Sequence, residues 1–194
     1  MRLSAWSGMR PWLIGVLLSA AGMFLGYDLG SETARLLGGE PGIWARMGKG
    51  AVWGGVIAAL QWPVVRSAGV LPLRFLVASA VGFAVGYPLG QTIQLILTFR
   101  WSLHWTGFVS ALATFGLCLA LPQWWSFRRQ IPHASLWSLF SMAGWMLSGA
   151  AWSGPAVDVV DSVAYGMVAG LGLVWLVRSQ RPVVVADRSD ERSR

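Results

Sequence analysis

Six long apolar segments follow one another along almost the whole of the 194-residue chain. An α-helix needs about 20 mostly apolar residues to cross the hydrocarbon core of a bilayer, and each segment is close to that length. The sequence therefore predicts an all-α integral membrane protein with six transmembrane helices. The predicted spans are residues 12–29, 45–65, 73–97, 106–127, 135–152 and 157–177.

The amino-acid composition favours the same class. Hydrophobic residues make up 55% of the chain and charged residues only 12%, whereas a typical soluble domain has about 25% charged residues. A soluble core of this size would not bury so much apolar surface. The single cysteine, Cys118, lies in an apolar segment, so an internal disulfide framework is excluded.

The basic residues predict the orientation in the membrane. With these six spans, eleven arginines fall on the side of the two termini and four basic residues fall on the other side. Because lysine and arginine are enriched in cytoplasmic loops, both termini are predicted to be cytoplasmic. The same bias accounts for the net charge of +7 without a nucleic-acid partner. The predicted outer side carries Arg35, Arg46, Lys49 and Arg100 and the acids Asp28, Glu32, Glu40, Asp158 and Asp161.

The chain contains 13 tryptophans, and most lie near the ends of the predicted spans. Indole rings prefer the boundary between headgroups and hydrocarbon, so these residues predict two aromatic belts. Trp53, Trp137 and Trp145 are not assigned to either belt. Helix packing is the expected role of these three, and contact with a pigment or another ligand is the alternative.

Comparison of the chain with itself reveals an internal repeat. Residues 19–30 (SAAGMFLGYDLG) and residues 79–90 (SAVGFAVGYPLG) are identical at seven of twelve positions. A second register, at an offset of 62 residues, relates the later helices. It pairs Gly54 with Gly116, Gln61 with Gln123, Trp62 with Trp124, Arg66 with Arg128, Phe75 with Trp137, Ser79 with Ser141 and Gly82 with Gly144.

The repeat predicts three tandem helical hairpins, over residues of about 10–66, 67–128 and 129–178. Each unit contains two spans, so successive units enter the membrane in the same direction and are related by an axis along the membrane normal. We therefore expect one six-helix transmembrane domain over residues 1–180, in a pseudo-threefold arrangement. The first span resembles a signal peptide, but its place in the repeat argues against cleavage. Residues 181–194 are charged and are expected to form a disordered cytoplasmic tail.

Small residues recur at every fourth position in the odd-numbered spans. In a helix this spacing places them on one face, where a neighbouring backbone can approach closely. Helix packing is the expected role, and the lining of a narrow pore is the alternative. The residues are Gly22, Gly26, Gly30, Gly82, Gly86, Gly90, Gly144 and Ser148.

Gln61 and Gln123 each lie five residues before an arginine, about one and a half turns inside the predicted cytoplasmic boundary. A buried amide in lipid needs a partner, so a hydrogen bond between repeats is the expected role. The alternative, binding of a solute, would require both amides to face one cavity.

Two further groups of polar residues are candidates for a site. Gln91 and Gln94 follow Pro88 in the third span, where they are expected to help satisfy the carbonyl that the proline frees. Asp158 and Asp161 begin the sixth helix and complement its dipole. A deeper position would instead make either carboxylate a proton or cation site.

No pattern of residues indicates catalysis or a metal centre. His104 and His133 fall on opposite sides of the predicted membrane, outside any metal-ligand spacing. His104 alone, between Trp101 and Trp105, is a possible contact for a pigment or haem, although an interfacial histidine is the commoner case. The glycine-rich residues 38–42 lack the lysine and the strand of a phosphate-binding loop. We therefore predict neither enzymatic activity nor a bound cofactor.

A short motif ends two of the even-numbered spans. Gln61-Trp62 and Gln123-Trp124 stand at the cytoplasmic ends of glycine-containing helices and are followed by Arg66 and Arg128. This pattern resembles a loose group of bacterial multi-pass membrane proteins of unknown function. The resemblance implies an architecture in a bacterial-type cytoplasmic membrane, and it implies no activity.

Two classes of function fit these features. The first is a non-enzymatic accessory, assembly or structural subunit that interacts with other membrane components, favoured by short loops, many tryptophans and few buried charges. The second is a small-solute or ion transporter or channel, favoured by the parallel repeats, the glycine stripes and the paired glutamines. In both cases the lipid bilayer is the immediate partner.

Overall fold

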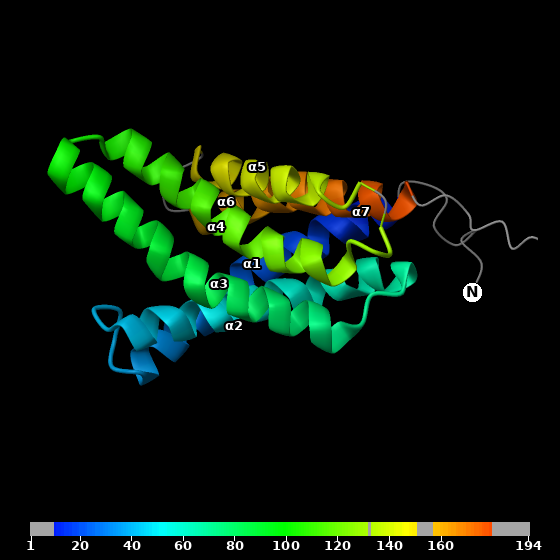
Figure 1. The fold of residues 1–194 in the computed structure, drawn as a ribbon, viewed down its shortest axis with the longest axis horizontal. Coiled ribbons are helices and arrows are strands. Elements are labelled where there is room, and N and C mark those ends of the chain that lie inside the picture. Colours follow the sequence, from blue (N-terminus) through cyan, green and yellow to red (C-terminus); the bar gives the residue numbers. More distant parts are fainter. Residues whose placement is uncertain (1–9, 132, 151–156, 180–194) are drawn as a thin grey trace, which may run out of the picture.

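The computed structural model describes residues 10–131, 133–150 and 157–179, and every regular element within them is helical. The helices run lengthwise along the molecule in one bundle (Figure 1). They are α1 (Arg10–Leu36), α2 (Ile43–Val65), α3 (Pro72–Leu95), α4 (His104–Phe127), α5 (Leu136–Ala150), α6 (Val157–Tyr165) and α7 (Leu171–Arg178). A 3-10 turn, η2 (Arg66–Ala68), follows α2, and π-helical turns η3 (Ile96–Arg100) and η4 (Gly166–Gly170) follow α3 and join α6 to α7.

Four helical stretches of the described chain are long and apolar enough to cross a membrane: Arg10–Leu36, Pro72–Arg100, His104–Phe127 and Val159–Arg178. The all-helical prediction is confirmed, and these four stretches support a membrane protein. Helix α2, which contains Arg46, Lys49 and Gln61, is not among these four stretches, and the described part of α5 has only 15 residues. Spanning by α2 and α5 therefore stays a prediction.

The first helix is longer than its predicted span, which ended at residue 29. Helix α1 continues to Leu36, and the ion pair between Arg35 and Glu32, at 2.8 Å and one turn apart, stabilises this last part. The helix ends before Gly38, whose φ of 94° is a conformation that favours glycine. Hydropathy alone missed this extension because Ser31, Glu32, Thr33 and Arg35 are polar. Glutamate, alanine, arginine and leucine in the same stretch are good helix formers.

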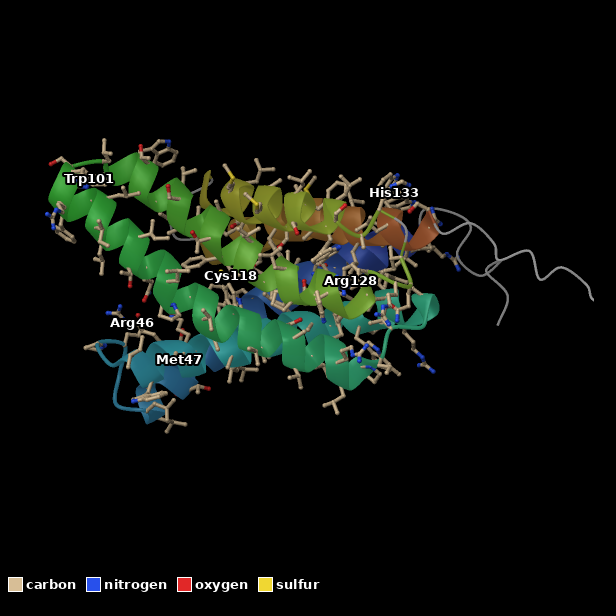
Figure 2. The ribbon with its side chains drawn as sticks, in the orientation of Figure 1. Arg46, Met47, Trp101, Cys118, Arg128 and His133 are labelled. Atoms are coloured by element: carbon tan, nitrogen blue, oxygen red, sulfur yellow. The ribbon has the colours of Figure 1, made fainter. Side chains whose placement is uncertain are left out.

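The connections between helices gather at the two ends of the bundle (Figure 1). Residues 37–42 and 101–103 lie at one end, which we call the Trp101 end, and residues 66–71 and 128–131 lie at the other, the Arg128 end. Figure 2 shows Trp101 and Arg46 toward the first of these and Arg128 and His133 toward the second. His104 begins α4 next to the Trp101 end, so the two histidines lie at opposite ends of the bundle.

Each helix packs against the next one along the chain, and α1 also packs against α6, η4 and α7, so that the bundle closes into a ring. Glycines permit the close contacts within the first two hairpins. A Cβ added at Gly22 would lie 2.9 Å from Ile57 Cα of α2, and one added at Gly82 would lie 2.3 Å from the carbonyl oxygen of Cys118 in α4. The other stripe glycines of α1 and α3 approach the same partner helices, α2 and α4: Gly26, Gly30, Gly86 and Gly90.

Glycines of α2, α4 and η4 contact the helix that follows next around the ring. Gly54 approaches Ser79 and Phe83 of α3, and Gly116 approaches Ser141 and Met142 of α5. Gly166, in η4, approaches Val16 and Ala20 of α1 and so closes the ring. In the third hairpin Gly144 faces Tyr165 and Ser148 is buried. These small residues therefore face neighbouring helices and do not line a pore.

Candidate ligand-binding cavity

A cavity of about 290 Å³ lies among the helices in the half of the bundle nearer the Trp101 end. Helices α1 to α6 all contribute side chains to its wall. The wall consists of Met23, Phe24, Tyr27, Trp53, Tyr87, Gln91, Gln94, Phe108, Leu112, Phe115, Trp145, Ser148, Gly149, Asp161 and Ser162. A concave, mostly apolar space with a few polar groups is the usual form of a small-molecule site.

Aromatic rings fill the centre of the bundle below this cavity. We call the rings of Trp53, Phe83, Phe115, Trp145 and Tyr165 the aromatic plug. Phe83 and Tyr165 are fully buried and lie about one turn closer to the Arg128 end than the wall residues Tyr87 and Asp161. The ring centroids of Trp53 and Phe83 are 5.3 Å apart, those of Phe115 and Trp145 are 5.4 Å apart, and those of Trp145 and Tyr165 are 5.5 Å apart. These are favourable contacts between aromatic rings from different helices.

Several polar groups stand in the wall of the cavity. Gln91 Nε2 donates a hydrogen bond of 2.9 Å to the hydroxyl of Tyr87, and Ser148 Oγ donates to the carbonyl oxygen of Trp145 at 2.7 Å. The indole N–H of Trp145 is buried and has no acceptor among the described residues. Asp161 is half-buried in the wall. The cavity thus combines aromatic faces with one carboxylate and several neutral polar groups.

The predicted roles of the polar residues in the third and sixth spans are partly wrong. Gln91 does not satisfy the carbonyl freed by Pro88, because its amide bonds to the hydroxyl of Tyr87 one turn earlier. Gln94 lies in the wall of the cavity. Asp161 also lies in that wall, more than a turn past the start of α6, whereas the side chain of Asp158 is outside the described part of the structure.

A buried ion pair lies beside the cavity. The side chain of Lys49 is only 3% exposed, and its Nζ lies 2.5 Å from Oε1 of Glu40 in the α1–α2 connection. The same Nζ lies 4.4 Å from the ring centroid of Tyr27 and 5.3 Å from that of Tyr87. The ammonium group is therefore compensated by one carboxylate and by the faces of two tyrosine rings.

Gln61 and Gln123 do not reach the cavity. Gln61 Nε2 donates to Ser19 Oγ at 3.2 Å, and Gln123 Nε2 donates to Ser79 Oγ at 2.9 Å. Both bonds join the two helices of one hairpin, so the predicted bond between repeats is wrong for the amide nitrogens. Only the carbonyl of Gln123 bonds to another unit, accepting from Trp137 Nε1 at 2.7 Å. The two fully buried amides have a structural role and do not share a solute site.

The other motif residues stack at the Arg128 end. The guanidinium of Arg66 lies 5.4 Å from the ring centroid of Trp62, and that of Arg128 lies 5.5 Å from the ring of Trp124 and 3.5 Å from that of Trp125. The guanidinium of Arg178 also lies over a tryptophan ring, at 5.0 Å from the centroid, but this ring belongs to Trp12 of another helix, α1. These are cation–π contacts that fix arginine side chains at one end of the bundle.

Sequence reasoning missed Tyr27, Tyr87 and the pair of Lys49 and Glu40. Two signals were present. The tyrosines occupy the same position of the repeat, in GYDLG and GYPLG, and Lys49 is the only lysine of the chain, within a predicted span. A lone lysine at such a position needs a partner, and intramembrane charges commonly mark functional sites.

A second hollow lies on the outside of the bundle. This groove of about 450 Å³ is lined almost entirely by apolar atoms. Its lining consists of Trp12, Phe140, Met167, Val168, Leu171, Gly172 and Trp175. Among the described residues, the indole N–H groups of Trp12 and Trp175 are the only polar side-chain groups of this lining.

Among the described residues, no group of three or more histidine, cysteine, aspartate or glutamate side chains is placed to hold a metal ion.

Comparison of the chain with protein-family models, curated proteins and solved structures finds no match. The fold and the cavity by themselves define the class of the protein, which is a helical, membrane-type protein with a cavity among its helices.

Proposed function

We propose that the protein has six transmembrane helices arranged as three parallel hairpins around a pseudo-threefold axis. Two regularities support this arrangement. Gly54, Gly116 and Gly166 each contact the next odd-numbered helix, which is α3, α5 and α1 respectively. The residue before each of these glycines is aromatic (Trp53, Phe115 or Tyr165), and all three rings belong to the aromatic plug.

We assign the Arg128 end to the cytoplasm of a bacterial-type cytoplasmic membrane. The excess of arginine on that side and the arginine–tryptophan contacts of residues 66, 128 and 178 support this orientation. Asp161 precedes Arg178 by about 17 residues, which corresponds to roughly 25 Å of helix. In a hydrocarbon core of about 30 Å, Asp161 and the cavity would lie just below the outer surface.

In this orientation we propose a non-enzymatic protein that binds a small ligand from the outer side of the membrane. The observation that carries the proposal is one mostly apolar cavity with several polar groups, to which six helices contribute side chains. The aromatic plug beneath it favours capture of the ligand over passive conduction, so transport would require the plug to rearrange.

Filling the cavity tests this proposal. Wild-type protein is purified in mild detergent and its bound small molecules are identified by mass spectrometry, alongside Gln94→Trp and Leu95→Trp variants. Gln94 lies in the cavity wall, whereas its neighbour Leu95 is 46% exposed on the outside. We expect a ligand in the wild type and in the Leu95→Trp variant and its loss from the Gln94→Trp variant. The same small-molecule content in all three would overturn the proposal.

The apolar groove supports a second candidate function, that of a subunit of a larger membrane complex. A side chain of a neighbouring transmembrane helix would fill this groove, since Trp175 at its edge is 41% exposed. Mild purification with chemical cross-linking tests it. A stoichiometric partner that is lost in a Trp175→Ala variant would favour the subunit, and recovery of the protein alone would contradict it.

A further inference from the structure

We propose that the Arg128 end of the bundle binds an anionic phospholipid, whose phosphate is held between Arg128 and Arg74. This surface lies away from the cavity, in the other half of the bundle, so the inference goes beyond the proposed ligand-binding function and does not depend on it. A phospholipid combines a phosphate group with acyl chains, and separate observations support each part.

The distribution of charge supports an anionic partner. Six arginines lie at or beside the Arg128 end: Arg10, Arg66, Arg74, Arg128, Arg129 and Arg178. The acids whose side chains are described lie in the half nearer the Trp101 end: Asp28, Glu32, Glu40 and Asp161. Residues 1–9 and 180–194, which are outside the described part, contain five arginines and three acids, so by sequence they add no net negative charge. A partner of this end therefore meets an excess of positive charge.

Arg128 is held in a form that suits phosphate (Figure 2). The carbon of its guanidinium lies 3.5 Å from the ring centroid of Trp125, against the face of the indole, and 5.5 Å from that of Trp124. A guanidinium stacked in this way keeps its N–H donors in its own plane, where they match two oxygens of a phosphate. Among the described residues, no acid forms an ion pair with Arg128. Its donors are therefore available to a ligand.

Arg74 lies close to Arg128 on the neighbouring helix. Arg74 precedes Phe75 in the first turn of α3, and Arg128 follows Phe127 at the end of α4. The ring centroids of Phe75 and Phe127 are 6.2 Å apart, so each arginine is one residue from a contact between the two helices. Both arginines are exposed. A phosphate between them would be contacted from both helices.

Exposed apolar side chains beside the two arginines support a lipid over a free phosphate. Leu73, next to Arg74, is 73% exposed, and Trp125, about one turn before Arg128, is 62% exposed. Acyl chains would cover the leucine, and an indole ring is favoured at the boundary between headgroups and hydrocarbon. A free phosphate would leave both side chains uncovered. The arrangement of charge above apolar surface therefore matches a phospholipid.

The repeat provides a natural comparison for this site. Arg66 is the residue paired with Arg128, and its guanidinium lies 5.4 Å from the ring centroid of Trp62. At the position that corresponds to Trp125 the first unit has Pro63, so Arg66 lacks the closely stacked ring. Arg66 thus has the same charge at the same end of the bundle without the same support.

Lipid binding to the purified full-length protein tests the inference. Native mass spectrometry in detergent measures the binding of dioleoylphosphatidylglycerol and dioleoylphosphatidylcholine, which share their acyl chains. In the second lipid, a trimethylammonium group offsets the charge of the phosphate. We expect phosphatidylglycerol to bind about fivefold more tightly or better, as one arginine at a membrane surface would provide. An excess of glycerol 3-phosphate, which has no acyl chains, should not displace it.

Three variants locate the site. Arg128→Gln should lower the affinity for phosphatidylglycerol about fivefold and leave that for phosphatidylcholine unchanged. Trp125→Leu keeps every charge, yet it should lower the affinity for phosphatidylglycerol about two- to fivefold, because the guanidinium loses its ring. Arg66→Gln is the matched control and should cause a smaller loss than Arg128→Gln. Circular dichroism spectra that match the wild type establish that each variant is folded.

Several outcomes would overturn the inference. Equal affinities for the two lipids would exclude a site for an anionic headgroup. Equal losses for Arg128→Gln and Arg66→Gln, or no loss for Trp125→Leu, would indicate attraction by the total charge of this end in place of a built site. Displacement of phosphatidylglycerol by glycerol 3-phosphate would contradict the contacts with acyl chains. The ligand-retention experiment on the cavity is independent of all these results.

Discussion

Gln61 and Gln123 hold the same position in the repeat, yet their hydrogen bonds differ. The carbonyl of Gln123 accepts from Trp137 Nε1, but Oε1 of Gln61 is buried without a donor among the described residues. The residue that the repeat pairs with Trp137 is Phe75, which has no group to donate. The two amides are therefore expected to contribute differently to stability.

We predict that Gln123→Leu lowers the free energy of unfolding by about 1–3 kcal/mol, because it leaves the buried Trp137 N–H without an acceptor. Gln61→Leu should cost less than about 1 kcal/mol, since it removes one hydrogen bond and also one unsatisfied oxygen. Reversible unfolding of both variants in mixed micelles with increasing sodium dodecyl sulfate measures the difference. Equal costs would contradict the hydrogen-bond assignment.

Lys49 and Glu40 are also unequal partners. The side chain of Lys49 is 3% exposed and that of Glu40 is 46% exposed. Removing the carboxylate leaves the buried ammonium beside Tyr27 and Tyr87 without its charged partner, whereas removing the ammonium leaves a carboxylate that water can still reach.

We therefore expect Glu40→Ala to lower the free energy of unfolding by about 1–3 kcal/mol and Lys49→Met to lower it by less. Glu32→Ala is the matched control, because its ion pair with Arg35 is exposed at both side chains and such pairs contribute at most about 1 kcal/mol. The same micelle titration provides the values. A larger loss of stability for Lys49→Met than for Glu40→Ala would contradict the assignment of Lys49 as the buried partner and Glu40 as the partner that water reaches.

At the scale of the helix, the neighbouring glycines Gly54 and Gly55 separate packing from intrinsic helix propensity. A Cβ at Gly54 would lie 2.6 Å from the Cβ of Phe83 and from the carbonyl oxygen of Ser79, both in α3. A Cβ at Gly55 would have its nearest neighbour, the Cβ of Ala80, at 3.9 Å. Only the first position requires glycine for the contact between α2 and α3.

We predict that Gly54→Ala destabilises the protein by about 1–3 kcal/mol through overpacking. Gly55→Ala should be neutral or stabilise it by up to about 1 kcal/mol, since alanine is the better helix former. The midpoints of thermal unfolding, followed by circular dichroism in detergent, report both changes. A destabilisation of the same size at Gly55 would contradict the assigned contact.

The helices themselves were largely predictable. Apolar runs located each helix to within a few residues, apart from the polar extension of α1 beyond residue 29. Partners across helices were less predictable. The amides of Gln61 and Gln123 were expected to bond between units, and that of Gln91 was expected to satisfy the carbonyl freed by Pro88. Their observed partners differ, because one sequence does not show which way a side chain turns on its helix.

For the whole molecule, the cavity could not be predicted from the sequence, because its wall is assembled from single residues on six helices. With the three units related as we propose, its position has a simple explanation. Where the first two units have Tyr27 and Tyr87, the third unit has Gly149, and all three residues lie in the wall. The missing ring leaves space on the side of the third unit, and Asp161 of the same unit is exposed to that space.

The central claim, a six-span protein with a cavity near its outer face, is tested most directly by labelling single cysteines in intact cells. In a Cys118→Ser background, Gln94→Cys reports on the cavity wall and Arg129→Cys reports on the Arg128 end. We predict that a membrane-impermeant maleimide labels the Gln94→Cys variant in intact cells and labels the Arg129→Cys variant only after the membrane is opened. Labelling of the Arg129→Cys variant in intact cells, with protection of the Gln94→Cys variant until the membrane is opened, would contradict the account.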